Sequence, residues 1–403
     1  MILNEKAQPG LAAVCGCLLV ICLAGCAGPR QAPSKPAPFF PLGIYGVEET
    51  NDLALVKQAG FNLVTGPVTG EYLDAAERVG LKVLGTPRTT AGPFFDPARA
   101  RQIVARFDRH PALWAWYLTD EPDLNWIDPE AVRQAHLFLK SLPARKPTAL
   151  VLYQGASGLD YGRVADITMI DCYPVPWMPL ANFGLQVRLM RLALGKERPL
   201  IAVIQAFDWS AYPENLRGEK ALRPPTLEEL RCMTYCALAE HANGLFYYVF
   251  SDAKWRLPEH PQTWAAVREV VGEVNARRPL FQAEYRWWPK EVEFAEPALR
   301  FNAALSASVQ SVLLRARQGN AQVPAGDYIL AVNTTPQFHV YSVTLPYDLD
   351  LYPPSEKPSP AGIPVLGEER SLPVQSGWIS DVFEPYSVHI YGPLPAAPQA
   401  AKP

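Results

Sequence analysis

Two adjacent carboxylates, Asp120 and Glu121, directly follow an apolar and aromatic run at residues 116–119 and precede Pro122. Apolar runs of this kind are typical of buried strands. Pro122 has no backbone N–H to donate to a sheet, so it marks where the strand stops. The two acids are therefore expected at the C-terminal end of a strand, where parallel α/β proteins build their active sites. A pair of acids in a solvated loop would give the same local pattern, and only the surrounding elements can decide.

Further polar and aromatic residues follow the other predicted strands. They are Glu48, Arg88, Asp171, Tyr173, Gln205, Asp208, Trp209, Asp252 and Trp255. Carboxylates interleaved with tryptophan and tyrosine fit a carbohydrate cleft, because aromatic rings stack on sugar faces and acids bond to hydroxyls or do the chemistry. We expect these residues to surround the two acids and contact substrate. A structural role within the barrel is the alternative for each acid.

Strand alternation separates the roles of the two acids. Successive side chains of a strand point to opposite faces, so Glu121 shares a face with Tyr117 and Thr119, and Trp116 lies on the other. The more polar face is predicted to line the barrel interior, which points Glu121 inward at the mouth. Asp120 beside it could tune the pKa of Glu121 or bind a hydroxyl, and a structural role fits it equally well.

The segments that position these residues alternate between strand and helix signals. Strands are predicted at residues 42–47, 61–65, 81–84, 113–119, 148–153, 167–170, 200–204 and 245–250. Asp96 and Asp128 each precede a proline and predict helix starts, and residues 226–229 form a capping box. Eight strand–helix repeats in about 240 residues predict a closed (β/α)8 TIM barrel at residues 41–278. A doubly wound open sheet is the alternative.

The pattern changes after residue 278. Segments at 310–315, 327–333, 339–344 and 386–391 alternate with period two, and no helix signal intervenes. This pattern predicts a C-terminal antiparallel β-sandwich at residues 279–392. Residues 393–403 are rich in proline and alanine, and we expect them to be disordered.

The Asp-Glu-Pro sequence on the fourth strand resembles the Asn-Glu-Pro motif of clan A glycoside hydrolases, which also place a β-sandwich after a barrel. The resemblance covers about residues 41–390. It implies that Glu121 is the general acid/base and that Asp120 replaces an asparagine that binds a substrate hydroxyl. The family's nucleophilic glutamate lies on strand seven, where this chain has Gln205, whose neutral amide cannot form the glycosyl ester. Asp208 follows three residues later, in a predicted loop.

Without that nucleophile, hydrolysis of an oligo- or polysaccharide would need a second carboxylate as base. The candidates are Asp171 and Asp252, and Asp171 at the end of strand six is the first choice. Carboxyl groups about 6.5–9.5 Å apart indicate inversion, and about 5–5.5 Å indicates retention. Two other functions stay open. The barrel could bind glycans without cleaving them, or it could be only the scaffold of an envelope protein.

The N-terminus resembles a bacterial lipoprotein signal at residues 1–26. The apolar segment at 11–23 is too short to span a bilayer as a normal helix, and it ends in Leu-Ala-Gly-Cys at Cys26. This lipobox-like sequence implies that Cys26 is lipidated, with residues 27–40 as a Pro/Ala-rich tether. An ordinary signal peptide or an uncleaved anchor is the alternative. We expect a lipid-anchored envelope protein facing the periplasm or exterior, in the outer membrane of a Gram-negative cell because Ala27 follows the cysteine.

Composition excludes several other classes of function. The 403 residues carry a net charge of -3, which gives no basic surface for nucleic acid. A G-x-G-x-x-G after a strand, a P-loop, H-E-x-x-H and G-x-S-x-G are all absent from the sequence. We therefore expect no cofactor and no metal.

Overall fold

The computed structural model describes residues 39–87, 95–143, 146–215, 222–285, 308–345, 362–375 and 378–394. Cys26, most of the predicted tether, Arg88 and residues 395–403 lie outside these ranges. Across the described ranges, no helix combines the length and apolarity that a membrane span requires.

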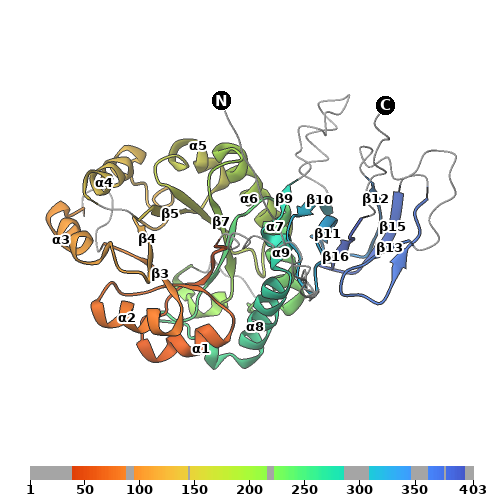
Figure 1. The fold of residues 1–403 in the computed structure, drawn as a ribbon, viewed down its shortest axis with the longest axis horizontal. Helices are drawn as coiled ribbons and strands as arrows, with labels where there is room; N and C mark the ends of the chain where they lie inside the picture. Colours follow the sequence, from red (N-terminus) through yellow and green to blue (C-terminus); the bar gives the residue numbers. More distant parts are fainter. Residues whose placement is uncertain are drawn as a thin grey trace, which may run out of the picture. The chain divides into compact units, whose positions relative to one another are not determined.

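Eight parallel strands close into a barrel in sequence order, with helices following the strands along the chain (Figure 1). The strands are β1 (Leu42–Ile44), β2 (Leu63–Thr65), β3 (Lys82–Gly85), β4 (Leu113–Tyr117), β5 (Thr148–Leu152), β6 (Ile167–Asp171), β7 (Leu200–Gln205) and β8 (Gly244–Tyr248). β1 pairs in parallel with β8, for example Leu42 with Leu245. This closure confirms the predicted TIM barrel and excludes an open doubly wound sheet.

The helices begin where the sequence signals placed them. Asp96 caps one helix by accepting from two backbone N–H groups, and Asp128 caps the next by accepting from Glu130 N. Thr226 and Glu229 form the predicted capping box. The α-helices are α1 (Leu53–Gln58), α2 (Gly70–Val79), α3 (Pro97–Phe107), α4 (Pro129–Ser141), α5 (Gly158–Tyr161), α6 (Leu180–Leu194), α7 (Leu227–Ala239), α8 (Pro261–Ala276) and α9 (Arg278–Phe281). Short 3-10 helices are η1 (Thr50–Asp52), η2 (Gly155–Ser157), η3 (Trp209–Ala211), η4 (Pro213–Asn215) and η5 (Leu257–Glu259).

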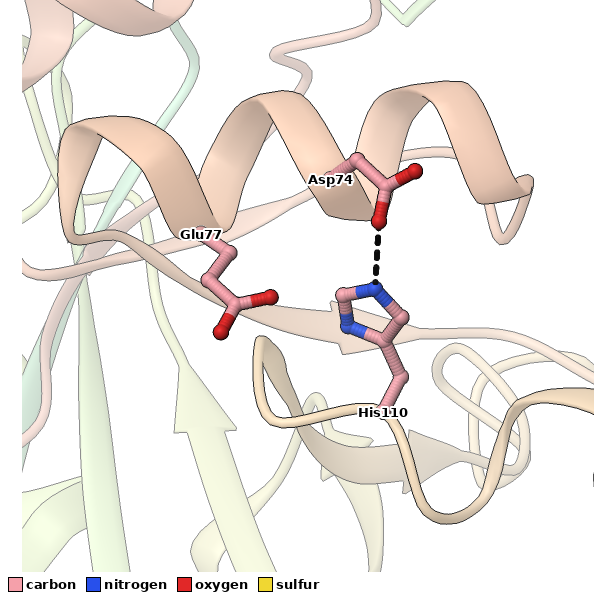
Figure 2. A group of neighbouring side chains, drawn as sticks. All are labelled: Asp74, Glu77 and His110. Atoms are coloured by element: carbon pink, nitrogen blue, oxygen red, sulfur yellow. Dashed lines mark hydrogen bonds and ion pairs between the residues drawn. The ribbon is translucent and has the colours of Figure 1, made fainter.

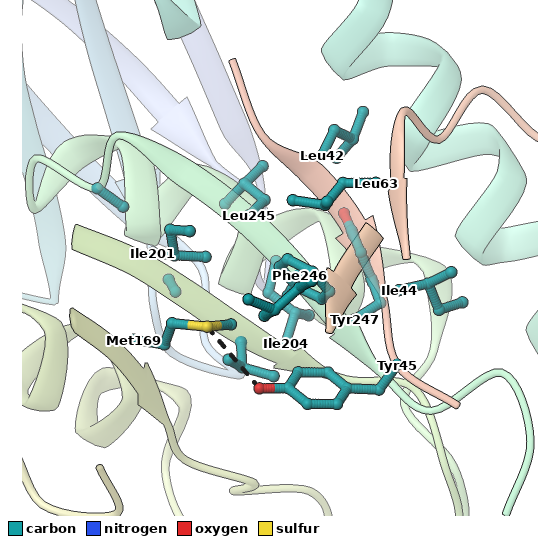
Figure 3. Packing of buried hydrophobic residues seen from close by; sticks show 14 of the residues in the cluster. Leu42, Ile44, Tyr45, Leu63, Met169, Ile201, Ile204, Leu245, Phe246 and Tyr247 are labelled. Carbon is teal, nitrogen blue, oxygen red and sulfur yellow. Dashed lines mark hydrogen bonds between the residues drawn. The ribbon is translucent and has the colours of Figure 1, made fainter. Parts of the chain in front are cut away.

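Large side chains fill the barrel interior (Figure 3). The Phe246 ring lies over Gly43, where an added Cβ would come 2.4 Å from the ring, so only glycine leaves it room. The Tyr45 ring packs edge-on against Phe246 with centroids 5.1 Å apart. Its hydroxyl lies 3.9 Å from the Met169 sulfur across the interior (Figure 3). Because the interior is packed, a ligand site has to lie at the mouth.

Strand β4 confirms the predicted alternation and ends earlier than expected. Trp116 is fully buried on the helix side and donates from Nε1 to Asp108 Oδ1 at 2.9 Å. Tyr117 lies on the interior side, with its hydroxyl 3.3 Å from that of Tyr45. The strand stops at Tyr117 rather than at residue 119, and the chain turns at Glu121, whose φ is +41°. Beyond the strand, alternation no longer determines where a side chain points. The first and last strands also end before their predicted limits, at residues 44 and 248.

The C-terminal region forms antiparallel sheets, which confirms the predicted β-sandwich. One sheet has the order β16 (Val388–Tyr391), β11 (Gly326–Asn333), β10 (Val309–Ala316) and β9 (Glu284–Tyr285). The other pairs are β12 (His339–Thr344) with β15 (Trp378–Phe383), and β13 (Ile363–Pro364) with β14 (Ser371–Leu372). Buried residues from these sheets share one core. Leu394, predicted to be disordered, is buried in that core because its N–H bonds to Asp327 O.

Candidate active site

Glu121 and Asp171 meet at the mouth of the barrel. Glu121 follows β4, and Asp171 is the last residue of β6. Their carboxyl groups are within hydrogen-bonding reach of each other, with Asp171 buried and Glu121 partly buried. Two carboxyl groups in contact cannot both ionise easily, so the pair retains a shared proton. The structure therefore brings together the first-choice pair from the sequence.

The surroundings favour the protonated forms of both acids. Burial raises the pKa of Glu121 to about 7, and the charge of Asp120 adds to this rise. Burial also raises the pKa of Asp171 well above its usual range, followed by the charge of Glu121. The Tyr173 hydroxyl donates to Asp171 Oδ2 at 3.1 Å and opposes the rise. Asp171 Oδ1 is buried and has no N–H or O–H donor, which leaves it to share a proton with Glu121.

Asp120 lies beside the pair and is held by tyrosines. The Tyr117 hydroxyl donates to Asp120 Oδ1, and it also contacts the Tyr45 hydroxyl. Asp120 is open to solvent on one side, yet the surrounding protein raises its pKa despite the hydrogen bond from Tyr117. An accessible carboxylate in this position is able to accept a hydrogen bond from a substrate hydroxyl.

A group of packed aromatic rings lies next to Asp171. Tyr173 packs edge-on against Phe207, with centroids 5.2 Å apart. The Trp209 indole donates to Tyr173 O at 3.4 Å and lies 5.0 Å from the Trp177 ring, at 33° between the planes. Trp177 is 36% exposed, so part of its ring is open to solvent. Tyr173 and Trp209, both predicted as binding residues, thus form one surface with Trp177.

Asp252 lies at the far side of this aromatic group. Its Oδ2 accepts from the Tyr212 hydroxyl at 2.7 Å and from the Tyr248 hydroxyl at 3.3 Å. Its Oδ1 accepts from two backbone N–H groups, including that of Trp255 at 2.8 Å. The carboxylate therefore organises the loop after β8. The Tyr248 ring lies 5.5 Å from the ring of Tyr173, which donates to Asp171, so two tyrosines stand between Asp252 and the acid pair.

Two predicted substrate contacts are wrong. Gln205 is fully buried, and its amide accepts from Val175 N at 2.9 Å and donates to Val175 O at 2.8 Å and Phe207 O at 3.2 Å. No donor of this amide is left for a ligand. Trp255 is 4% exposed and stacks on His260, with centroids 3.6 Å apart, because the β8 loop folds back on itself.

The remaining predicted residues lie around the periphery. Asp208 accepts from Ser210 N at 2.8 Å and caps η3, so its carboxylate has a structural partner. Glu48 is exposed on the loop after β1, where its charge acts on Tyr72. Arg88 lies outside the described residues.

Sequence reasoning missed several tyrosines of the site. Tyr45, Tyr248 and Tyr153 directly follow or end β1, β8 and β5, so the rule that selected the other strand-end residues could have found them. Burial raises the pKa of Tyr153, and the charges of Cys172, Glu121 and Asp171 add to this rise. Tyr153 follows β5, which lies between β4 and β6 in the barrel, so it stands between the strands that carry Glu121 and Asp171.

One group of possible metal ligands occurs among the residues that the structure describes. Asp74 and Glu77 project from α2 toward His110, and their ligand atoms lie within 4.8 Å of one another (Figure 2). Ala112 N donates to His110 Nδ1 at 3.2 Å, which leaves the ring proton on Nε2, 3.1 Å from Asp74 Oδ1. A metal at Nε2 would need that nitrogen unprotonated and would break this arrangement. The group is best described as a hydrogen-bonded histidine on the surface.

Solved structures resemble the chain in fold. A glycoside hydrolase is 12% identical, with a TM-score of 0.53 over 88% of this chain and 92% of that protein. AmyP, solved in complex with maltose, is 10% identical, with a TM-score of 0.52 over 89% of this chain and 97% of its own. A GH42 β-galactosidase from G. stearothermophilus is 12% identical, with a TM-score of 0.46 over 60% of this chain. The chain spans only 57% of that enzyme's length.

No protein-family model and no curated protein sequence matches the chain. The closed barrel and the first two of these solved structures show a (β/α)8 barrel fold. At such low identity the likeness extends to the fold alone.

Proposed function

We propose that this protein hydrolyses glycosidic bonds of an oligo- or polysaccharide, with Glu121 as the general acid/base. The observation that carries the proposal is the contact between Glu121 and Asp171 at the barrel mouth. A pKa of about 7 keeps much of Glu121 protonated near neutral pH. Such a carboxylic acid is able to protonate the oxygen of a leaving group, and matching of the pKa to the working pH makes this transfer efficient.

Asp171 is the proposed partner of Glu121. One proton shared by two carboxyl groups supplies one acid and one base, which is the protonation state that inversion needs. The buried amide of Gln205 occupies the strand-seven position, which removes the nucleophile needed for retention and supports inversion. The anomeric configuration of the first product, followed by NMR, tests this assignment.

The central experiment replaces Glu121 by glutamine. Glu121→Gln keeps the size of the side chain and removes the acidic proton, so we expect hydrolysis to fall at least about 10²-fold while sugar binding persists. Glu197→Gln is the matched control, because Glu197 is an exposed glutamate in the loop before β7, at the opposite end of the strands from the acids. Turnover by the Glu121 variant at the wild-type rate would refute the assignment.

A second function is glycan binding without cleavage. The observation that favours it is Gln205, a neutral residue where the related hydrolases place their nucleophile. This alternative predicts that wild-type protein binds a polysaccharide, while product analysis finds no new reducing ends after prolonged incubation. Binding together with product release would exclude it.

We also propose that the chain is anchored in the envelope through a lipid on Cys26. The lipobox-like Leu-Ala-Gly-Cys sequence supports this assignment. Cys26→Ser should move the protein from the membrane fraction to the soluble envelope fraction. An unchanged distribution would favour an ordinary signal peptide or an uncleaved anchor.

A further inference from the structure

Trp126 projects from the loop that follows β4. Its side chain is 94% exposed, and Leu124 on the same loop is 47% exposed. Single exposed hydrophobic residues are common on protein surfaces. This one is unusual because the loop begins with Glu121, five residues earlier, and because the loop is held in one conformation.

Hydrogen bonds within the loop hold the indole away from the protein. Asn125 donates to Glu121 O from its backbone at 3.0 Å and from its side chain at 2.9 Å. Ile127 N donates to Pro122 O at 2.9 Å. Trp126 has a φ of +55°, a left-handed conformation that costs a bulky residue free energy and persists only where the surroundings enforce it. The exposed ring is therefore presented by a fixed backbone.

A second segment supports this loop and continues the exposed surface. Asp123 accepts from the backbone N–H groups of Tyr153 and Gln154, both at 3.0 Å. The Tyr161 hydroxyl on α5 donates to Ile127 O at 2.5 Å, which joins the segment before α4 to α5 (Figure 1). Tyr153 is 40% exposed and follows β5, between the strands that carry Glu121 and Asp171. Accessible aromatic surface thus occurs both beside the acids and on the loop that extends from them.

The distance between the acids and the indole is short. Five residues of extended chain cover at most about 18 Å, so the backbone of Trp126 lies within that distance of Glu121. A molecule of a few linked rings is therefore long enough to contact both the acids and the indole.

The negative charge of the loop that carries Trp126 indicates which class of ligand it can bind. The loop at residues 120–128 contains four acids and no lysine or arginine. Such a surface repels anionic lipid headgroups and acidic polymers. A neutral sugar ring has no charge to repel, and its apolar face is able to stack on an indole.

We propose that Trp126 and Tyr153 form an outer platform that binds a neutral polysaccharide chain while one of its linkages lies at Glu121 and Asp171. This proposal rests on the proposed function for the class of ligand. It assigns a polymer, rather than a disaccharide, as the substrate class of the site. Tyr153 contacts units near the acids, and Trp126 stacks on a unit further along the chain.

The test separates polymer binding from catalysis. Each variant is made in the Glu121→Gln background, and its binding to soluble neutral β-glucan, α-glucan, mannan and galactan is measured by affinity electrophoresis. Trp126→Ala should weaken binding of the preferred polymer about tenfold. Trp126→Phe should retain most of the affinity. Leu192→Ala, at a 57% exposed leucine on α6, is the control for loss of an exposed apolar side chain and should change nothing.

Activity measurements use the catalytically intact protein. With Trp126→Ala, KM for the polymer should rise about tenfold, while turnover of a short chromogenic glycoside stays unchanged. The platform is overturned if Trp126→Ala binds the polymer as tightly as the protein that keeps Trp126, or if the protein that keeps Trp126 binds none of the four polymers. Trp126-dependent binding to phosphatidylglycerol vesicles, or Trp126-dependent dimerisation, also overturns it. Trp126-dependent polymer binding without any hydrolysis by the wild type would leave the platform standing and refute the proposed function instead.

Discussion

The burial of Glu121 predicts a pH-dependent loss of stability that can be measured without knowing the substrate. The folded state raises the pKa of Glu121 from its ordinary value of 4.5 to about 7, chiefly through burial. A carboxyl group with a raised pKa favours the folded state fully below pH 4.5, and this contribution is lost as the pH rises through 7. At about 1.36 kcal/mol per pKa unit, ionised Glu121 costs the folded protein about 3 kcal/mol above pH 8.

Glu121→Gln removes this cost because the amide stays neutral. The variant should match the wild type near pH 4.5 and exceed it by up to about 3 kcal/mol at pH 8. Urea unfolding followed by tryptophan fluorescence at the two pH values measures the difference, read as a shift of the transition midpoint. Glu48→Gln, at an exposed glutamate on a neighbouring loop, should show no such pH-dependent gain. If Glu121→Gln differs from the wild type equally at both pH values, the raised pKa of Glu121 in the folded state is refuted.

Three further substitutions test other parts of the site and barrel. Asp120→Asn removes a charge that raises the pKa of Glu121, so the alkaline limb of the kcat/KM profile should move about 1 pH unit lower; an unmoved limb would show that Asp120 does not act on the acid. Gln205→Glu replaces an amide that donates to two backbone carbonyls with a carboxylate that cannot donate, so the free energy of unfolding in urea should fall by about 2–4 kcal/mol. A gain of hydrolysis in that variant would contradict the structural role of Gln205. Gly43→Ala places a methyl group 2.4 Å from the Phe246 ring, and a loss of about 1–3 kcal/mol in urea unfolding is expected; wild-type stability would show that the ring moves freely.

Much of the fold could be predicted from local signals. Caps such as Asp96 and Asp128 mark helix starts because their side chains satisfy backbone N–H groups of the first turn, and the structure shows both. The roles of Gln205 and Trp255 could not be predicted in the same way. Gln205 ends β7 and Trp255 lies in the loop after β8, so both were expected at the mouth. In the structure the backbone of Val175 binds the Gln205 amide, and His260 stacks on Trp255. A strand-end position places a residue near the mouth, and only the folded loops determine whether it is exposed.

The sequence by itself determined the order of strands and helices, and with it the barrel and the ring of acids and aromatics at one end. It did so because alternation, caps and proline positions are local properties of the chain. Tertiary structure alone decided that Glu121 touches Asp171 and that their environment favours the protonated forms. It also decided that Trp126 is fixed in an exposed position. These features depend on how loops from β4, β5 and β6 meet in space, because contact and desolvation act between residues that are far apart in the sequence.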